Sequence, residues 1–176
     1  MLIDPRAFVL IGTNILLLYI MQLLNSACSS YLFYWVLAGP MLVFPALFLS
    51  HRSGSFCLLC SGLWIDASTP GIFGSFTISF LIMGTMLFVL RHRFRVEHNY
   101  HPLIIAQITN AIVIVLLSLS NGQGNYHVLD LWILTITTFL GSSLLLLFIA
   151  PWFFNFQRML FEQFRMNSEP EDIPIP

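Results

Sequence analysis

Residues 72–95 read IFGSFTISFLIMGTMLFVLRHRFR, and this stretch decides the class of fold. Its first part, Ile72–Leu90, carries no charge and matches the roughly 20 residues that a helix needs to cross about 30 Å of hydrocarbon. The run ends in Arg91, Arg93 and Arg95, which is typical of the cytoplasmic end of a membrane span. The pattern predicts a transmembrane helix whose inner end is anchored.

The composition of the whole chain also indicates a membrane protein. Of the 176 residues, 57% are hydrophobic and 9% are charged, and the seven residues counted as Lys or Arg are all arginine. A soluble domain carries charge on about a quarter of its residues, so this chain cannot cover a water-facing surface. The same scarcity excludes a nucleic-acid binder and a disordered chain, and three cysteines are too few for a disulfide scaffold.

Further apolar runs give the layout of the chain in the membrane. The expected spans are residues 8–24, 32–49, 55–68, 72–90, 103–119 and 131–150. The apolar run of the third, residues 56–65, is too short by itself and is expected to reach across by recruiting residues 50–55 and 66–68. If it crosses, all seven arginines lie on one side; if it is a re-entrant hairpin, they divide between both sides. The positive-inside bias favours six spans, with both termini cytoplasmic.

The expected fold is therefore an all-α integral membrane protein with one domain over residues 1–166. Pro151 suits the first turn of a new helix over residues 152–166, in which Phe153, Phe156, Leu160 and Phe164 form one stripe. This predicts a helix in the inner interface or a continuation of the last span. The acidic, proline-rich tail, residues 167–176, is predicted to be disordered.

Asp66 is the one acidic residue well inside the apolar part of the sequence. An ionisable group there is expected to face the interior and to find partners. Ser68, Thr69 and the free N–H groups at the start of the next helix offer such partners. The favoured interpretation is a cap that orients the turn between two helices, and the alternative is a ligand or proton site. Small and turn-forming residues around it are expected to make the turn and the close packing: Gly62, Pro70, Gly71 and Gly74.

Other polar residues have structural interpretations. Cys57 and Cys60 have the spacing of a redox or metal pair, but without further ligands nearby they are expected to fill a helix interface. The cluster Arg91, Arg93 and Arg95 is expected to set topology and to contact anionic lipids. Neutral polar residues within the spans are expected to hydrogen-bond between helices: Asn14, Gln22, Gln107, Thr109 and Asn110. The sequence has no nucleophile–base pair and no phosphate loop, so we expect no enzyme, no cofactor and no metal.

Two stretches carry a family resemblance. One is Gly62-x3-Asp66-x7-Gly74, in a short apolar helix that turns into a longer one ending at Arg91–Arg95. The other is Pro151-Trp152, followed by Arg158 in a helix rich in Phe and Gln. With six spans and a Ser50-His51-Arg52 break, the chain resembles the bacterial rod shape-determining protein MreD family over most of residues 42–164.

The resemblance implies a non-enzymatic inner-membrane component of the elongation machinery that builds the lateral cell wall. It implies binding to an MreC-like partner and, indirectly, to MreB and the RodA–transpeptidase pair. It also implies a helix arrangement similar to that of the substrate-binding subunits of energy-coupling-factor transporters. Gly62, Asp66 and Gly74 correspond to the family's turn between the third and fourth helices, although Pro70 lies nearer to Asp66 than is usual.

A small-molecule, vitamin-type uptake subunit of the same architecture is the alternative function. Such a subunit needs a pocket of polar and aromatic groups that opens outward. The outer loops Asn25–Tyr31 and Asn121–Asp130 could line such a pocket.

Overall fold

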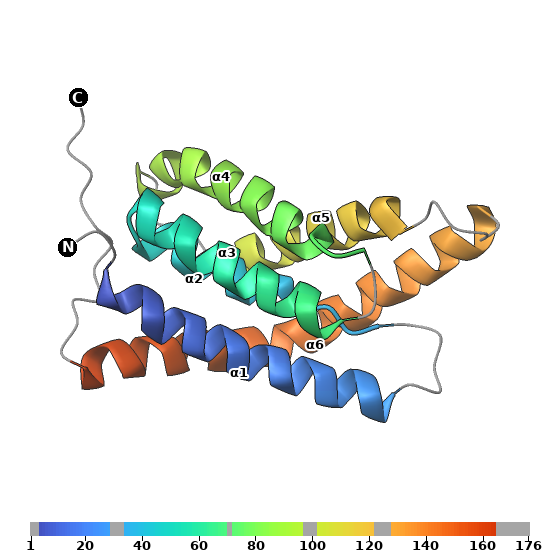
Figure 1. The fold of residues 1–176 in the computed structure, drawn as a ribbon, viewed down its shortest axis with the longest axis horizontal. Helices are drawn as coiled ribbons and strands as arrows, with labels where there is room; N and C mark the ends of the chain where they lie inside the picture. Colours follow the sequence, from blue (N-terminus) through green and yellow to red (C-terminus); the bar gives the residue numbers. More distant parts are fainter. Residues whose placement is uncertain (1–3, 29–33, 70–71, 97–101, 122–127, 165–176) are drawn as a thin grey trace.

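The computed structural model describes residues 4–28, 34–69, 72–96, 102–121 and 128–164. These residues form six α-helices, and no strand occurs among them (Figure 1). The helices are α1 (Pro5–Ala27), α2 (Ala38–Phe48), α3 (His51–Ser68), α4 (Ser75–Val96), α5 (Pro102–Asn121) and α6 (Val128–Gln163). The all-helical class predicted from the sequence is confirmed.

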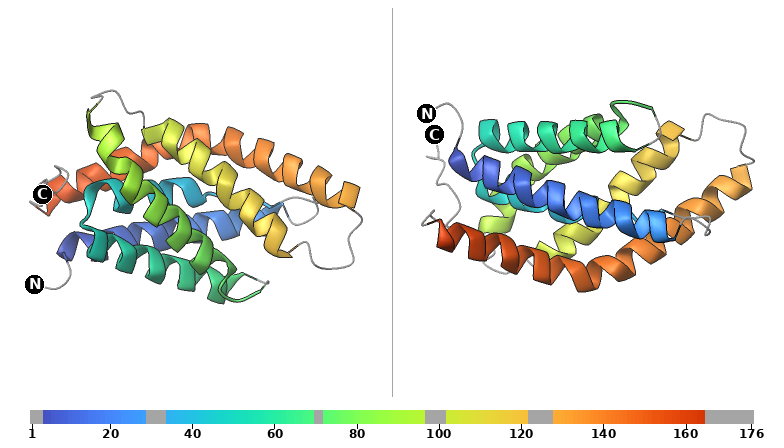
Figure 2. Two further views of the ribbon diagram at one scale, coloured as in Figure 1. Left: turned by 90° about the horizontal axis from the view of Figure 1, so that it is seen from above. Right: turned by 60° about the horizontal axis from the view of Figure 1, so that its bottom comes forward.

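The helices alternate in direction along the long axis of the bundle, as Figures 1 and 2 show. α1, α3 and α5 run one way, and α2, α4 and α6 run back. α1 begins and α6 ends at the same end, which we call the basic end because Arg6, Arg52 and Arg91 lie there. The opposite end, where α3 ends and α4 and α6 begin, is called the far end.

Several helices have the character of membrane helices. Three are long and apolar enough to cross a membrane by length and composition, namely Pro5–Ala27, Pro102–Leu119 and Leu129–Gln163. Two shorter apolar helices are Ala38–Phe48 and Ser75–Arg91. Large apolar side chains such as Phe8 (59% exposed) and Phe148 (74% exposed) point outward, where a water-facing bundle would place charge.

α2 is the central helix of the bundle. Every one of its residues is buried, and it contacts each of the other five helices. The predicted span 32–49 is too long, because residues 34–37 are not helical and α2 begins only at Ala38. A start at Ala38 places Pro40 in the first turn, where its missing N–H breaks no helical bond. Eleven residues rise only about 16 Å, roughly half the thickness of a bilayer core.

A second proline inside α2 is compensated by a neighbouring helix. Pro45 has no N–H for the carbonyl of Met41, four residues earlier. Asn14 of α1 donates its Nδ2 to that Met41 carbonyl at 3.2 Å and to Ser61 Oγ of α3 at 3.0 Å. One buried amide therefore links three helices and satisfies the carbonyl that the proline leaves open.

α3 begins at His51, so the predicted recruitment of residues 50–55 is confirmed. It is one continuous helix with its ends at opposite ends of the bundle, and a re-entrant hairpin does not describe it (Figure 1). Gly54 lies beside the carbonyl of Pro45, and a Cβ there would come within 2.9 Å of that oxygen. α3 therefore packs closely on α2 near the basic end.

α6 does not end at Pro151. The prediction of a new helix over 152–166 is wrong, because one helix runs from Val128 to Gln163 with Pro151 inside it. α6 bends along its length (Figure 2), and a proline within a helix is a common cause of such a bend. The alternative, a continuation of the preceding helix, agrees with this single helix. Residues 167–176 lie outside the described residues.

Candidate functional site

Asp66, in the last turn of α3, caps the start of α4 at the far end. Its side chain is 7% exposed and accepts hydrogen bonds from Phe76 N (3.0 Å), Thr77 N (2.9 Å) and Thr77 Oγ1 (2.5 Å). The first N–H groups of a helix have no partner within the helix and carry partial positive charge, so a buried carboxylate meets both needs. The cap predicted from the sequence is confirmed.

Gly62 brings α3 and α4 close together one turn before Asp66. A Cβ at Gly62 would lie 2.7 Å from the Cα of Thr77, a distance that real Cβ atoms do not tolerate. The close approach expected at Gly62 is therefore confirmed. Thr77 meets Gly62 and Asp66 together, and we call Gly62, Asp66, Gly74 and Thr77 the α3–α4 joint.

Two details of the predicted turn are wrong. Ser68 and Thr69 donate their hydroxyls to the Ile65 carbonyl, at 3.1 and 2.8 Å, rather than to Asp66. Gly74 has no atom within 4 Å of a Cβ built on it, so it does not serve close packing. Its φ of +97° explains the glycine instead, because this left-handed region strains other residues. Pro70 and Gly71 lie outside the described residues.

A cavity of about 620 Å³ lies beside the α3–α4 joint at the far end. Neighbours of the joint supply part of its wall, namely Ser68 and Thr69 at the end of α3 and Phe76, whose N–H donates to Asp66. The remaining lining comes from α1, from residues 34–36 and from the far-end halves of α5 and α6: Met21, Gln22, Asn25, Ser26, Tyr34, Trp35, Val36, Ile114, Leu117, Ser118, Leu131, Leu134, Thr135 and Thr138. The cap at Asp66 therefore also positions a cavity wall.

Side chains of other helices hold the backbone that leads into α2. Asn25 of α1 accepts from Trp35 N (2.7 Å) and donates to Trp35 O (3.1 Å). Ser142 of α6 accepts from Val36 N at 2.9 Å. Asn110 of α5 accepts from Ala38 N and Gly39 N at 3.0 and 3.3 Å, which caps α2. Non-helical backbone is tolerated at membrane depth only when its polar groups are satisfied in this way.

The neutral polar residues of the spans have mixed outcomes. Asn14, Gln107 and Asn110 hydrogen-bond between helices as predicted, Gln107 through its Nε2 to the Ser143 carbonyl at 2.8 Å. Gln22 lines the cavity, and neither its side chain nor that of Thr109 makes a hydrogen bond within the described part of the chain. The sequence reasoning missed Ser142 and the hydrogen bonds of Asn25 to Trp35. No local pattern marks these roles, since each residue stands beside another polar residue, Ser143 and Ser26.

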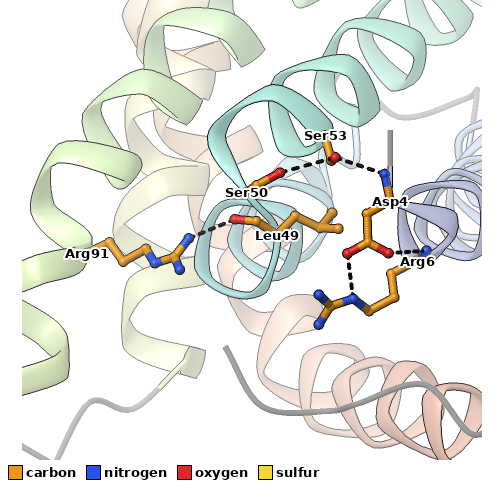
Figure 3. Close-up of polar contacts among 6 residues, drawn as sticks. All are labelled: Asp4, Arg6, Leu49, Ser50, Ser53 and Arg91. Carbon is orange, nitrogen blue, oxygen red and sulfur yellow. Dashed lines mark hydrogen bonds and ion pairs between the residues drawn. The ribbon is translucent and has the colours of Figure 1, made fainter. Parts of the chain in front are cut away.

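Polar contacts at the basic end join the start of α1, the α2–α3 connection and α4, as Figure 3 shows. Asp4 caps α1 by accepting from Arg6 N (2.9 Å) and pairs with Arg6 Nε (2.7 Å). Its own N–H donates to Ser53 Oγ of α3 at 3.0 Å. Ser50 donates to the same Ser53 oxygen at 3.1 Å, which links the connection to the start of α3.

Arg91 is also part of this end, and its predicted contact with lipid headgroups is wrong. Its side chain is 3% exposed and donates Nη1 to the Leu49 carbonyl at 2.7 Å (Figure 3). That carbonyl lies at the C-terminal end of α2, where the last carbonyls lack helical partners and a cation is favourable. The side chains of Arg93 and Arg95 lie outside the described residues.

The last part of α6 packs on the bundle along a different face from the predicted stripe. Phe153, Gln157 and Phe161 are buried, whereas Phe164 is 58% exposed. Gln157 donates Nε2 to Thr13 Oγ1 of α1 at 3.0 Å, which ties the last helix to the first. The other predicted residues of this helix lie on its outside: Pro151 and Arg158 are exposed, and Trp152 stacks on Phe156 with ring centroids 5.6 Å apart.

The cysteine pair lies within α3. Cys57 is buried and Cys60 is partly buried, and both are free thiols. Among the described residues, no three His, Cys, Asp or Glu side chains lie close enough together to hold a metal ion.

Comparison of the chain with protein-family models, with curated proteins and with solved structures gave no match.

Proposed function

We propose that this chain is a non-enzymatic, multi-pass inner-membrane component of the cell-elongation machinery. It acts by binding an MreC-like partner and thereby maintains rod shape and lateral wall synthesis. The observation that carries the proposal is the α3–α4 joint, in which Gly62 and Asp66 of the family-like motif both meet Thr77, beside Gly74 at its positive φ. A joint of this kind fixes two helices against each other and suits a protein that works through its shape.

The proposed topology has six crossings with both termini in the cytoplasm. Its support is the alternating direction of the six helices together with the placement of Arg6, Arg52 and Arg91 at one end. The basic end then faces the cytoplasm and the far end, with the cavity, faces outward. In this topology α2 lies at the bundle centre and is shorter than a full membrane span. Side chains of α5 and α4 bind the backbone at its two ends, so the non-helical residues that flank it keep hydrogen-bond partners.

Thiol labelling tests this topology in intact cells. Cys28 follows α1 at the far end, and it is the reporter in a chain whose Cys57 and Cys60 are replaced by Ala. Cys28 is expected to react with an impermeant maleimide added outside, whereas a cysteine introduced by His92→Cys is not. Reaction of residue 92 from outside would contradict the six-crossing topology.

Purification in mild detergent tests the partnership. The wild-type chain is expected to bring an MreC-like protein with it. Gly62→Leu is expected to reduce that recovery, because a side chain at this position pushes α4 away from α3. Gly12→Leu is the matched control on α1, since nothing lies within 4 Å of a Cβ there. Equal recovery of the partner with both variants, at equal protein levels, would count against a role for the joint.

A small-molecule uptake subunit is the second candidate function, and the cavity of about 620 Å³ favours it. Sites for small molecules commonly occupy about 300–1,000 Å³ and combine apolar walls with a few polar groups. Asn25 and Ser26, from an outer segment expected to line such a pocket, do line it. Accumulation of labelled vitamins, measured in cells with and without the protein, tests this function. The function requires that cells with the protein accumulate more of the labelled vitamin.

A further inference from the structure

The far-end cavity carries no charged wall. Among the described residues that line it, none is Asp, Glu, Lys, Arg or His. Asp66 lies behind the wall, and its oxygens already accept three hydrogen bonds from α4. A charged ligand would lose its hydration here and gain no opposite charge, which strongly disfavours an ion. The site therefore selects an uncharged molecule.

Three hydroxyl groups of the wall donate their protons to backbone carbonyls. Ser68 and Thr69 donate to the Ile65 carbonyl, and Thr135 donates to the Leu131 carbonyl at 2.8 Å. Ser118 and Thr135 share a further hydrogen bond of 2.9 Å. A hydroxyl oxygen that donates its proton can still accept through its lone pairs. These three hydroxyl oxygens therefore remain available as acceptors for the donors of a ligand.

Two lining residues retain unused hydrogen-bonding capacity. Thr138 is 8% exposed, and its hydroxyl has no hydrogen-bond partner among the described residues. Gln22 lines the same cavity from α1, and its side-chain amide likewise has no hydrogen-bond partner among the described residues. Polar groups inside a protein normally have a hydrogen-bond partner, so an unpartnered hydroxyl that is open to a cavity offers a contact that a ligand can complete.

We infer that this cavity binds an uncharged amphiphile of drug-like size that carries hydroxyl or N–H donors. Its apolar part packs against side chains such as Met21, Phe76 and Ile114, and its donors meet the oxygens of Gln22 and Thr138. The inference shares its cavity with the second candidate function and gives that function a class of substrate. A protein that only holds the wall-building machinery together would need no such ligand.

Two dyes with the same aromatic rings provide the test. N-phenyl-1-naphthylamine is uncharged and has one N–H donor, whereas 8-anilino-1-naphthalenesulfonate adds a sulfonate to that scaffold. Binding is measured with the full chain in lipid nanodiscs, as saturable energy transfer from tryptophan above the signal from empty nanodiscs. We expect saturable binding of the neutral dye and at least tenfold weaker binding of the anionic dye.

Variants on α6 make the test specific to the cavity. Thr138→Val removes the unpartnered hydroxyl at nearly constant volume and is expected to weaken binding of the neutral dye about two- to tenfold, the effect of one hydrogen bond. Thr137→Val is the matched control, because Thr137 is exposed and bonds only to carbonyls of its own helix. Leu134→Trp fills part of the cavity and is expected to abolish saturable binding.

Three results would overturn the inference. These are equal binding of both dyes, no saturable binding of the neutral dye, and equal effects of Thr138→Val and Thr137→Val in variants that keep wild-type circular dichroism. Cell shape and vitamin accumulation are measured in cells without the dyes. A failure of dye binding is therefore distinguishable from a failure of either proposed function.

Discussion

Replacing Asp66 by leucine tests how much the carboxylate that caps α4 contributes to the stability of the protein. Leucine keeps the size of the side chain and removes both oxygens, so Phe76 N, Thr77 N and the Thr77 hydroxyl lose their shared acceptor. The hydroxyl can rotate to a carbonyl of its own helix, as the Thr85 hydroxyl does with Ile82. The two backbone N–H groups have no such alternative inside the bundle.

The size of the effect follows from those two N–H groups. A buried donor that loses its acceptor costs about 1–3 kcal/mol, so the loss of two is expected to make Asp66→Leu lower the free energy of unfolding by about 2–6 kcal/mol. Asp66→Asn keeps one acceptor oxygen but turns an amide N–H₂ toward groups that are themselves donors. We expect it to cost about 1–2 kcal/mol, the range of a lost helix cap.

Unfolding by SDS in mixed micelles, followed by circular dichroism, measures both changes. Asp130→Asn is the control, because Asp130 is an exposed acidic residue in the first turn of α6. A loss below about 0.5 kcal/mol for Asp66→Leu, the size of ordinary surface substitutions, would refute the cap as a source of stability. Normal stability of both Asp66 variants with complete loss of function would instead indicate the ligand or proton role.

Three further predictions concern contacts between helices and use the same unfolding assay. Gly62→Ala is expected to lower the free energy of unfolding by about 1–3 kcal/mol, because its Cβ would meet the Thr77 backbone. The control Gly12→Ala is expected to be neutral or stabilising, and equal effects of the two changes would contradict the close approach of α3 and α4. Arg91→Met is expected to cost about 1–3 kcal/mol, because it leaves the Leu49 carbonyl without its Nη1 donor. The control Arg158→Met changes an exposed residue and is expected to cost less than about 0.5 kcal/mol. Asn110→Leu is expected to cost about 1–3 kcal/mol through the freed N–H groups of Ala38 and Gly39, and a stability equal to that of wild type would contradict its role as the α2 cap.

Much of the fold could be predicted from the sequence, because hydrocarbon imposes a strong pattern on a chain. A run such as Ile72–Leu90 can only be a buried or lipid-facing helix. The arginines that the sequence places on one side of the membrane include Arg6, Arg52 and Arg91, which lie together at the basic end of the bundle. The cap at Asp66 was also predictable, since a lone carboxylate in an apolar segment must find donors and the next helix start provides them.

The remaining features depend on three-dimensional neighbours that a single sequence does not specify. The shortening of α2 depends on Asn110 and Ser142, which lie about 70 and 100 residues away along the chain and bind its approach segment. In the sequence Arg91 resembles Arg93 and Arg95, as one of three basic residues that follow an apolar run. In the structure its guanidinium donates to the Leu49 carbonyl at the end of α2. The cavity collects residues from five helices, and no local pattern predicts that their side chains leave a space.

Depletion of the protein from a rod-shaped cell that carries it tests the proposed function most directly. Cell width, incorporation of labelled wall precursor along the side wall and vitamin accumulation are measured together during depletion. The proposed function predicts rounded cells with reduced lateral wall synthesis and unchanged vitamin accumulation. Cells that keep their rod shape and wall synthesis but lose vitamin accumulation would contradict it and establish the uptake function in its place.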